Sequence, residues 1–328
     1  MIILNFTPGV ILSPPDPRDW LYSRVASPIS LPKKYRCKIT PLPVRDQGNK
    51  GTCVGQAGAN ANEVFQFKER GKAERLSSLY LYSMCKQLDG YPDIEGTFLR
   101  TLMKVLTKYG TPAESCMPYY TDWDKPPKPN LALHCLARMN RLKSYAKAQT
   151  EQELKQALVE QGPIPIAMML TTSFFNARNG VVPKEAEGTL LGGHAMTLIG
   201  YDDEAKLYEA IGSWGNAPCT RNGHHFIPYE LMHKPSLAMD SPIPVLLEAY
   251  SCVDMIEMKL PRTVHIADRP IQLINNGEFV DLDIPAVIIE EASRAYFPIR
   301  ELEKLGFSVK WTDLTSTIEL KRSGSDAK

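Results

Sequence analysis

The stretch Gln47-Gly48-Asn49-Lys50-Gly51-Thr52-Cys53-Val54-Gly55 decides how the first half of the chain folds. Apolar residues recur at spacings of three and four from Cys53 onward, at Val54, Ala57, Ala61 and Val64. This stripe predicts a helix that begins at Cys53 and ends at Gly71. A cysteine at a helix N-terminus meets the positive end of the helix dipole and free backbone N–H groups, which favour the thiolate and can stabilise an oxyanion. Gln47, six residues upstream, brings a side-chain amide donor to the same place.

Two later segments carry residue types that fit a reactive cysteine. Gly192-Gly193-His194-Ala195-Met196 places a histidine at the start of a predicted strand, 141 residues after Cys53, where glycines let it project into a cleft. Gly212-Ser213-Trp214-Gly215 follows, and Asn222-Gly223 comes shortly after it. Cysteine and histidine together can perform acyl transfer, with the histidine as base for the thiol.

The predicted elements change character along the chain. Helices are expected from Cys53, from Ser77 or Ser78, from about Thr97 to Tyr109, and after the capping box of Thr150 and Glu153. Short apolar or β-rich runs follow and predict strands at 164–170, 194–201, 207–211 and 224–227. A helical half followed by a strand-rich half predicts an α+β fold with two lobes.

The order and spacing of these segments resemble the papain family of cysteine peptidases, over about residues 33–252. The resemblance implies a papain-like fold with a helical lobe and a β-rich lobe, acting on a protein or peptide substrate. It implies that Cys53 is the nucleophile, that His194 is its ion-pair partner and later general acid, and that Gln47 is an oxyanion donor. It also implies that Trp214 shields the histidine from water.

Three positions depart from the family pattern, at Lys50, Val54 and Gly212. The family normally has an asparagine at the position of Gly212, where it accepts a hydrogen bond from the far nitrogen of the histidine. Loss of an orienting partner of this kind costs about 10–100-fold by analogy with metal sites. The sequence alone therefore predicts that Gly212→Asn raises activity, unless Asn216, a water or a backbone carbonyl already serves.

Three functions remain open at this stage. The first is an active endopeptidase that works through a thioester on Cys53. The second is a catalytically weakened papain fold that acts as a binding or structural part of a surface or virion assembly, which Gly212 favours. The third is a cell-wall amidase, which shares the order of cysteine and histidine but is disfavoured by Gln47 and the segment around Trp214.

The chain is expected to have three parts. Residues 1–32 are rich in proline and predict an extended segment, a candidate short propeptide, that lies against the catalytic domain and partly covers its cleft. Its expected apolar anchors are Val10, Ile11, Leu12, Trp20 and Leu21. Residues 33–259 form the peptidase domain, and residues 260–328 form a small strand-rich α+β module.

The last part has a resemblance of its own. The motifs Asn275-Asn276-Gly277, Ala295–Arg300 and Leu305–Trp311 resemble the small domain of bacterial surface proteins named after the copper amine oxidase N-terminal region. The expected helix there carries Ile299, Leu302 and Leu305. The resemblance implies a binding or positioning module with a cell-surface or virion partner, and a bacterial or phage origin.

The bulk composition narrows the classes of function. A net charge of +1, from 38 basic and 37 acidic residues, gives no electrostatic case for nucleic acid. No apolar run is long enough for a membrane span, and neither a secretory signal nor a metal or cofactor motif is found. His224 and His225 are expected on opposite faces of a strand, hence not a metal pair. Seven cysteines without an export signal favour mostly reduced thiols, and a cytoplasmic or virion location, with a secreted or surface location as the alternative.

Overall fold

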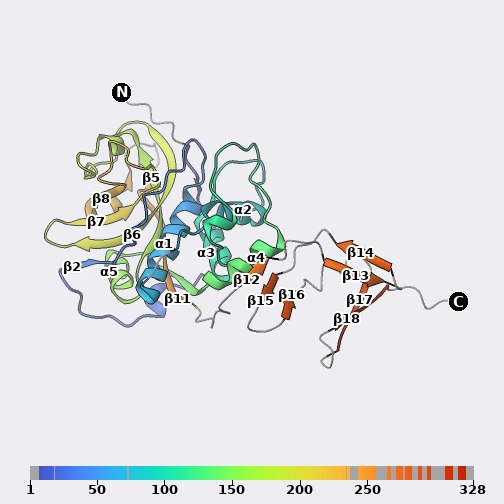
Figure 1. Ribbon diagram of the computed structural model, residues 1–328. Coiled ribbons are helices and arrows are strands. Elements are labelled where there is room, and N and C mark those ends of the chain that lie inside the picture. Colours follow the sequence, from blue (N-terminus) through green and yellow to red (C-terminus); the bar gives the residue numbers. More distant parts are fainter. Residues whose placement is uncertain are drawn as a thin grey trace. The chain divides into compact units, whose positions relative to one another are not determined.

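The computed structural model describes residues 7–17, 19–71, 74–233, 235–236 and 243–255, and the backbone of seven short strands between residues 264 and 322 (Figure 1). The chain divides into two compact units. The first comprises residues 1–129 and 136–257, and the second comprises residues 130–135 and 258–328. The first unit holds every residue of the candidate site.

Three helices form one side of the first unit. They are α1 (Cys53–Arg70), α2 (Ser78–Leu88) and α3 (Leu99–Lys108), which contact one another and lie together in Figure 1. Helix α1 begins and ends as predicted, with Gly71 in the left-handed conformation that favours glycine at a helix C-terminus. Helix α3 begins two residues later than predicted, because Thr97–Phe98 form the short strand β3 instead.

A sheet forms the other side. Among the described residues it follows the order β3-β1-β6-β5-β11-β4, with β2 and β7 also paired to β6, and β8 paired to β7. Its longest strand, β6 (Leu190–Asp202), pairs antiparallel with β5 (Ile164–Thr171) and lies against α1. The hydroxyl of Thr197 in β6 donates to the carbonyl of Ala57 in α1 at 2.8 Å. This contact fixes the strand that carries His194 against the helix that carries Cys53.

The remaining elements of the first unit support this arrangement. Their bounds are β1 Val10–Ile11, β2 Lys34–Arg36, α4 Leu131–Ala137 (whose residues 131–135 belong to the second unit), β4 Leu142–Lys147, α5 Glu151–Glu160, β7 Leu207–Ile211, β8 His224–Pro228, α6 Tyr229–His233, β9 Pro235–Ser236, β10 Ile243–Pro244 and β11 Leu246–Met255. Short 3-10 helices span Tyr22–Arg24, Glu114–Cys116, Arg138–Asn140 and Thr172–Asn176. The predicted capping box of Thr150 and Glu153 does begin α5.

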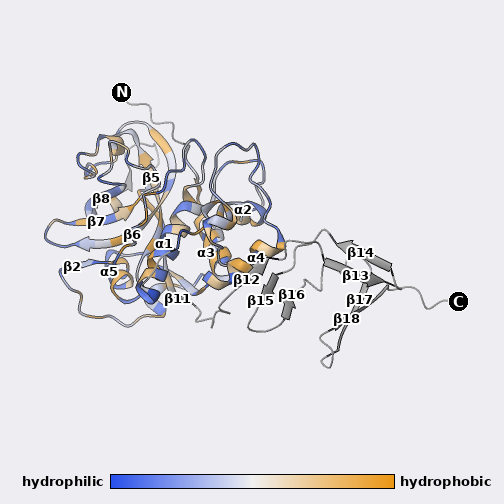
Figure 2. Ribbon diagram, in the orientation of Figure 1, coloured by the Kyte–Doolittle hydropathy of each residue, from blue (hydrophilic) through white to orange (hydrophobic). Residues whose placement is uncertain are grey.

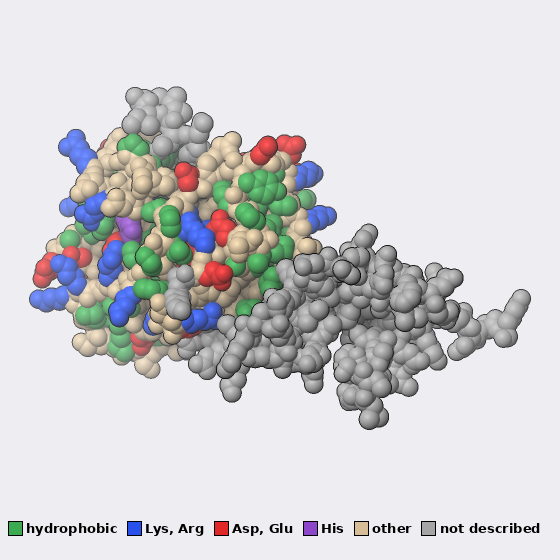
Figure 3. All heavy atoms as spheres, viewed as in Figure 1, with side chains coloured by type: hydrophobic (Ala, Val, Ile, Leu, Met, Phe, Trp, Pro, Cys, Tyr) green, Lys and Arg blue, Asp and Glu red, His purple; other side chains and the backbone are tan. Residues whose placement is uncertain are grey.

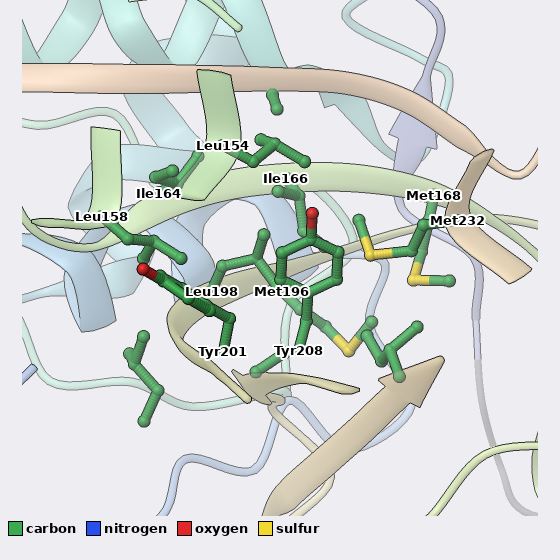
Figure 4. Packing of buried hydrophobic residues seen from close by; sticks show 14 of the residues in the cluster. Leu154, Leu158, Ile164, Ile166, Met168, Met196, Leu198, Tyr201, Tyr208 and Met232 are labelled. Carbon is green, nitrogen blue, oxygen red and sulfur yellow. The ribbon is translucent and has the colours of Figure 1, made fainter. Parts of the chain in front are cut away.

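The main core lies on the sheet face that α5 covers. Leu154 and Leu158 of α5 pack over Ile164 and Ile166 of β5, with Met196 of β6 beside them (Figure 4). These side chains alternate along each strand with residues that face α1, as a pleated strand requires. Figure 2 shows apolar residues on the helices and strands in the interior of the first unit. With helices on one side and the sheet on the other, the domain has the expected α+β fold.

Among the described residues of the second unit, the backbone forms three sets of antiparallel strands. They are β12 (Val264–Ile266) with β15 (Val287–Ile289) and β16 (Arg294–Tyr296), β13 (Ile271–Asn275) with β14 (Glu278–Leu282), and β17 (Phe307–Thr312) with β18 (Thr317–Arg322). The β13–β14 pair lies where the sequence predicts a hairpin, with Asn275 opposite Glu278. The predicted helix with Ile299, Leu302 and Leu305 lies outside the described residues.

Candidate active site

Cys53 is the first residue of α1 and is fully buried. Burial raises the pKa of its thiol to about 12, and the backbone N–H groups of Ala195, Gly9 and Val54 oppose that rise. The sequence predicts a thiolate at this helix N-terminus. In the structure the loss of water around the sulfur outweighs the dipole and the N–H groups, so the thiol is neutral. The contact with the Ala195 amide places the sulfur beside β6, next to His194 in the chain.

His194 is also fully buried. It lies inside β6 and not at its start as the sequence predicts, because the strand extends four residues upstream through the glycines. The indole of Trp214 stacks on the imidazole, with ring centres 4.3 Å apart and planes 24° apart. Burial, and then the nearby His225, lower the pKa of His194 well below its usual value. The Trp214 indole therefore covers one face of the imidazole, and the imidazole is neutral.

Gln47 is held at the same site by hydrogen bonds on both sides of its amide. Its Nε2 donates to the carbonyl of Lys50 at 2.8 Å and, at 3.4 Å, to the carbonyl of Thr7. Its Oε1 accepts from the hydroxyl of Ser213 at 2.7 Å. The Gln47 N–H donates to the Ser213 carbonyl at 2.9 Å, which ties this segment to the one that carries Trp214. Gln47 and the segment that carries Trp214, distant in sequence, are thus connected through backbone and side-chain hydrogen bonds.

The N-terminal segment lies across this group of residues. Val10 pairs antiparallel with Gly193 of β6 and parallel with Thr97 of β3, so β1 connects the two sides of the domain. The Gly9 N–H donates to the Gly193 carbonyl at 3.2 Å, and the Thr97 N–H donates to the Gly9 carbonyl at 3.0 Å. Residues 7–11 therefore occupy the groove between β3 and β6, directly over Cys53.

Gly9 allows the closest approach. A Cβ atom at this position would lie 2.2 Å from the Gly51 carbonyl oxygen and 2.8 Å from the Cys53 sulfur. Both distances are shorter than any ordinary contact of a Cβ atom, so only glycine fits without a shift. The carbonyl of Thr7, two residues before Gly9, accepts from the Gln47 amide at 3.4 Å.

Residues 12–24 anchor the segment outside the groove. Ser13 is buried, and both its N–H and its hydroxyl donate to the carboxylate of Glu248, at 3.0 and 2.9 Å. Arg100 bonds the Pro14 carbonyl and the Asp19 carboxylate. The expected anchors Leu12 and Trp20 are instead exposed, at 57% and 69%. Tyr22, which the sequence argument does not single out, is the side chain that enters the core.

Gly212 has a neighbour that the sequence argument misses. A Cβ atom on Gly212 would lie 2.8 Å from Nε2 and 3.0 Å from Cδ2 of His225. His225 is fully buried on β8, whereas His224 faces the other way and pairs with Glu209 at 2.9 Å. The opposite orientation of the two rings is as predicted. The sequence contains both parts of this contact, a glycine at 212 and a histidine at 225. Only the register of β7 with β8 shows that the two residues are neighbours.

The described residues contain no group of three or more His, Cys, Asp or Glu side chains that could hold a metal ion. None of the helices in this part of the chain has the length and apolar character to cross a membrane. All seven cysteines are free thiols. The face of the first unit in Figure 3 carries both acidic and basic side chains, in line with the balanced composition.

Known proteins similar to this chain in sequence or structure are cysteine peptidases or proteins like them. The sequence profile described as "Papain family cysteine protease" matches residues 31–231. An uncharacterized peptidase C1-like protein of Acanthamoeba polyphaga mimivirus is 26% identical over 226 residues, which cover 62% of this chain and 71% of that protein. Cathepsin 7 of Rattus norvegicus is 31% identical over 57% of this chain, which spans 56% of the cathepsin. The crystal structure of xylellain, a cysteine protease from Xylella fastidiosa, has a TM-score of 0.64 at 24% identity, covering 76% of this chain and 96% of xylellain.

Proposed function

The chain belongs to the papain family of cysteine proteases, and from that premise we propose that it is an endopeptidase that acts through a thioester on Cys53. The arrangement that supports this proposal is the Cys53 sulfur at the α1 N-terminus, against the backbone N–H groups of Ala195 and Gly9, with the Gln47 amide bonded to Thr7 of the same N-terminal segment. The same groove holds an extended segment of the chain itself, in backbone pairing with β3 and β6. An extended peptide is therefore the class of ligand that fits it.

The proposed reaction assigns a role to each residue. His194 takes the thiol proton as the Cys53 sulfur attacks the carbonyl carbon of the scissile bond. The Gln47 amide and the Cys53 N–H donate to the oxyanion that forms. As the C–N bond breaks, the leaving amine takes the proton from His194. Water then attacks the thioester, gives its proton to His194, and releases the carboxylic acid and the free thiol.

We further propose that the N-terminal segment keeps this site latent. Cys53 is fully buried against Gly9, His194 is fully buried against Trp214, and burial shifts the pKa of each group so that its neutral form is favoured. A thiolate and an imidazolium are the forms that react. Displacement of the segment would admit water, remove the desolvation penalty and let the helix dipole act on the sulfur.

Residues 260–328 are proposed as a separate binding or positioning module, with a cell-surface or virion partner. Its support is the resemblance of its motifs to the copper amine oxidase N-terminal-like domain and the antiparallel strand pairs. The alternative for the whole chain, a weakened papain fold that only binds, rests on the absence of a side chain at Gly212. The amidase alternative has no further support.

The decisive experiment compares wild type with Cys53→Ala. After the N-terminal segment is displaced, an epoxysuccinyl inhibitor is expected to add one inhibitor mass to Cys53, and a peptide substrate to be cleaved by wild type alone. Labelling without cleavage of any peptide in a library would favour the weakened fold. Equal cleavage by both proteins would contradict the proposed role of Cys53.

A further inference from the structure

The space next to Gly212 contains a ring, not a void. His225 Nε2 lies 2.8 Å from the place where a Cβ atom of residue 212 would be. The backbone holds the two residues together, since the Gly212 N–H donates to the Gly223 carbonyl at 3.0 Å, and β7 pairs with β8 up to Ile211 and His224. A side chain at 212 therefore requires the ring at 225 to move.

His225 packs against Trp214, the ring that covers His194. Its ring centre lies 5.3 Å from Trp214, nearly perpendicular to it, and 5.2 Å from Phe174. Trp214 in turn stacks on His194 at 4.3 Å. His225 is also the neighbouring group that acts electrostatically on His194, because its charge would oppose a charge there. The two imidazoles are thus neighbours in one enclosed cluster.

The polar atoms of His225 have no other use in the described part of the chain. Neither Nδ1 nor Nε2 makes a hydrogen bond there, although the ring is fully buried. A phenylalanine would fill the same space beside Phe174 and Trp214 without burying two polar nitrogens, which is costly when they are unpaired. A purely structural role therefore does not explain why this residue is histidine.

We infer that His225 is the positioning residue of His194, and that its ring acts from β8 in the place left open by Gly212. This inference rests on the proposed function of His194. The asparagine expected at residue 212 would offer an oxygen that accepts a hydrogen bond from the far N–H of the catalytic ring. A neutral imidazole offers one acceptor nitrogen for the same N–H. When His194 takes the Cys53 proton, that N–H becomes a stronger donor, so an acceptor stabilises the charged form.

The protonation state of His225 suits this role. Burial, and then the charge of His224, lower the pKa of His225 to about 3, so the ring is neutral at working pH. The neighbouring charged groups are His224, bonded to Glu209, and Arg36, bonded to the same carboxylate. Because these lie on the far side of β8, the side toward His194 keeps a neutral acceptor.

The test uses full-length variants at residues 225 and 212, each assayed after the N-terminal segment is displaced. His225→Phe keeps the aromatic packing and removes both nitrogens. It is expected to lower kcat about 10–100-fold with little change in KM. It is also expected to move the acid limb of the alkylation rate of Cys53 by iodoacetamide to higher pH, because the thiolate–imidazolium pair is weakened. His224→Gln is the matched control, since that ring faces away, and it should keep both quantities.

Substitutions at Gly212 supply a second, independent test. Gly212→Asn alone should lower kcat, because its side chain displaces His225, whereas Gly212→Asn with His225→Ala should exceed either single variant. A His225→Phe variant that is folded and keeps the wild-type kcat and pH profile would overturn the inference, as would a double variant no better than the two singles. If no peptide is cleaved even after the N-terminal segment is displaced, the proposed function fails, and the alkylation profile of Cys53 still decides the role of His225.

Discussion

Replacing Gly9 by alanine tests whether the N-terminal segment controls access to Cys53. The added Cβ atom would lie 2.2 Å from the Gly51 carbonyl oxygen and 2.8 Å from the Cys53 sulfur, and only when the segment is in the groove. Overpacking of this kind costs about 1–3 kcal/mol. Since each 1.4 kcal/mol is a factor of ten, the open fraction should rise roughly 5- to 150-fold.

The assay is the rate at which iodoacetamide alkylates Cys53 near neutral pH, followed by peptide mass spectrometry. When opening and closing are fast compared with labelling, the rate is proportional to the open fraction. Cys116 is exposed and provides an internal reference in every sample. Leu12→Ala is the matched control, because Leu12 belongs to the same segment and is 57% exposed. Its ratio of Cys53 to Cys116 labelling should equal that of wild type.

A shorter chain gives a check that does not depend on steric strain. Removal of residues 1–10 takes away the cover and keeps Ser13, Asp19 and Tyr22, whose contacts hold residues 12–24 in place. Removal of residues 1–30 would instead delete a core residue. If Gly9→Ala and the shortened chain both melt near wild type and label Cys53 at the wild-type ratio, the segment does not limit access and the reasoning is wrong.

Three further perturbations have defined outcomes. Lys86→Met should lower Tm and speed the labelling of Cys53. The buried Lys86 ammonium bonds Asp89 and the carbonyls of Ile94 and Gly96 beside the groove, and breaking a buried ion pair costs about 3–5 kcal/mol. Adding Asp89→Asn should recover part of the lost Tm. Ending the chain near residue 260 should leave the Cys53 labelling rate of a folded protein unchanged, and its loss would refute a separate module. Glu209, whose pKa His224 and Arg36 lower to about 2 against the cost of burial, should stabilise the fold above pH 4.5 and lose that effect toward pH 2; a Glu209→Gln variant with the wild-type difference in Tm between pH 7 and pH 3 would contradict this.

Local patterns in the sequence were sufficient to predict the elements that carry the site. The apolar stripe after Cys53 predicts α1 with both its ends, and the capping box predicts the start of α5. Both depend on interactions within a few residues, which a sequence displays directly. The start of β6 was misplaced because Gly192 and Gly193 indicate a turn by type, whereas in the structure they pair with the N-terminal segment and β5.

Burial of individual apolar residues in the N-terminal segment was not predictable from residue type. Leu12 and Trp20 look like anchors in the sequence but are exposed, whereas Tyr22 is buried with its hydroxyl donating to Glu160 at 2.5 Å. Apolar residues are common on protein surfaces, so type alone does not decide. The polar contact of Ser13 with Glu248 spans 235 positions in sequence, and no local pattern reveals such a pair.

Two glycines explain what sequence reasoning about this site can and cannot supply. Gly212 appears in the sequence as a missing partner, and Gly9 as an ordinary residue of a proline-rich segment. In the fold, the missing side chain at each position leaves space for another group. The His225 ring lies beside Gly212, and at Gly9 the backbone of the N-terminal segment lies against Cys53. A sequence displays the absence of a side chain, but the register of β7 with β8, and of β1 with β3 and β6, determines which group enters the space. Substitutions at these two glycines therefore separate the chemistry of the site from access to it, because Gly212 adjoins the ring beside His194, whereas Gly9 belongs to the segment that covers Cys53.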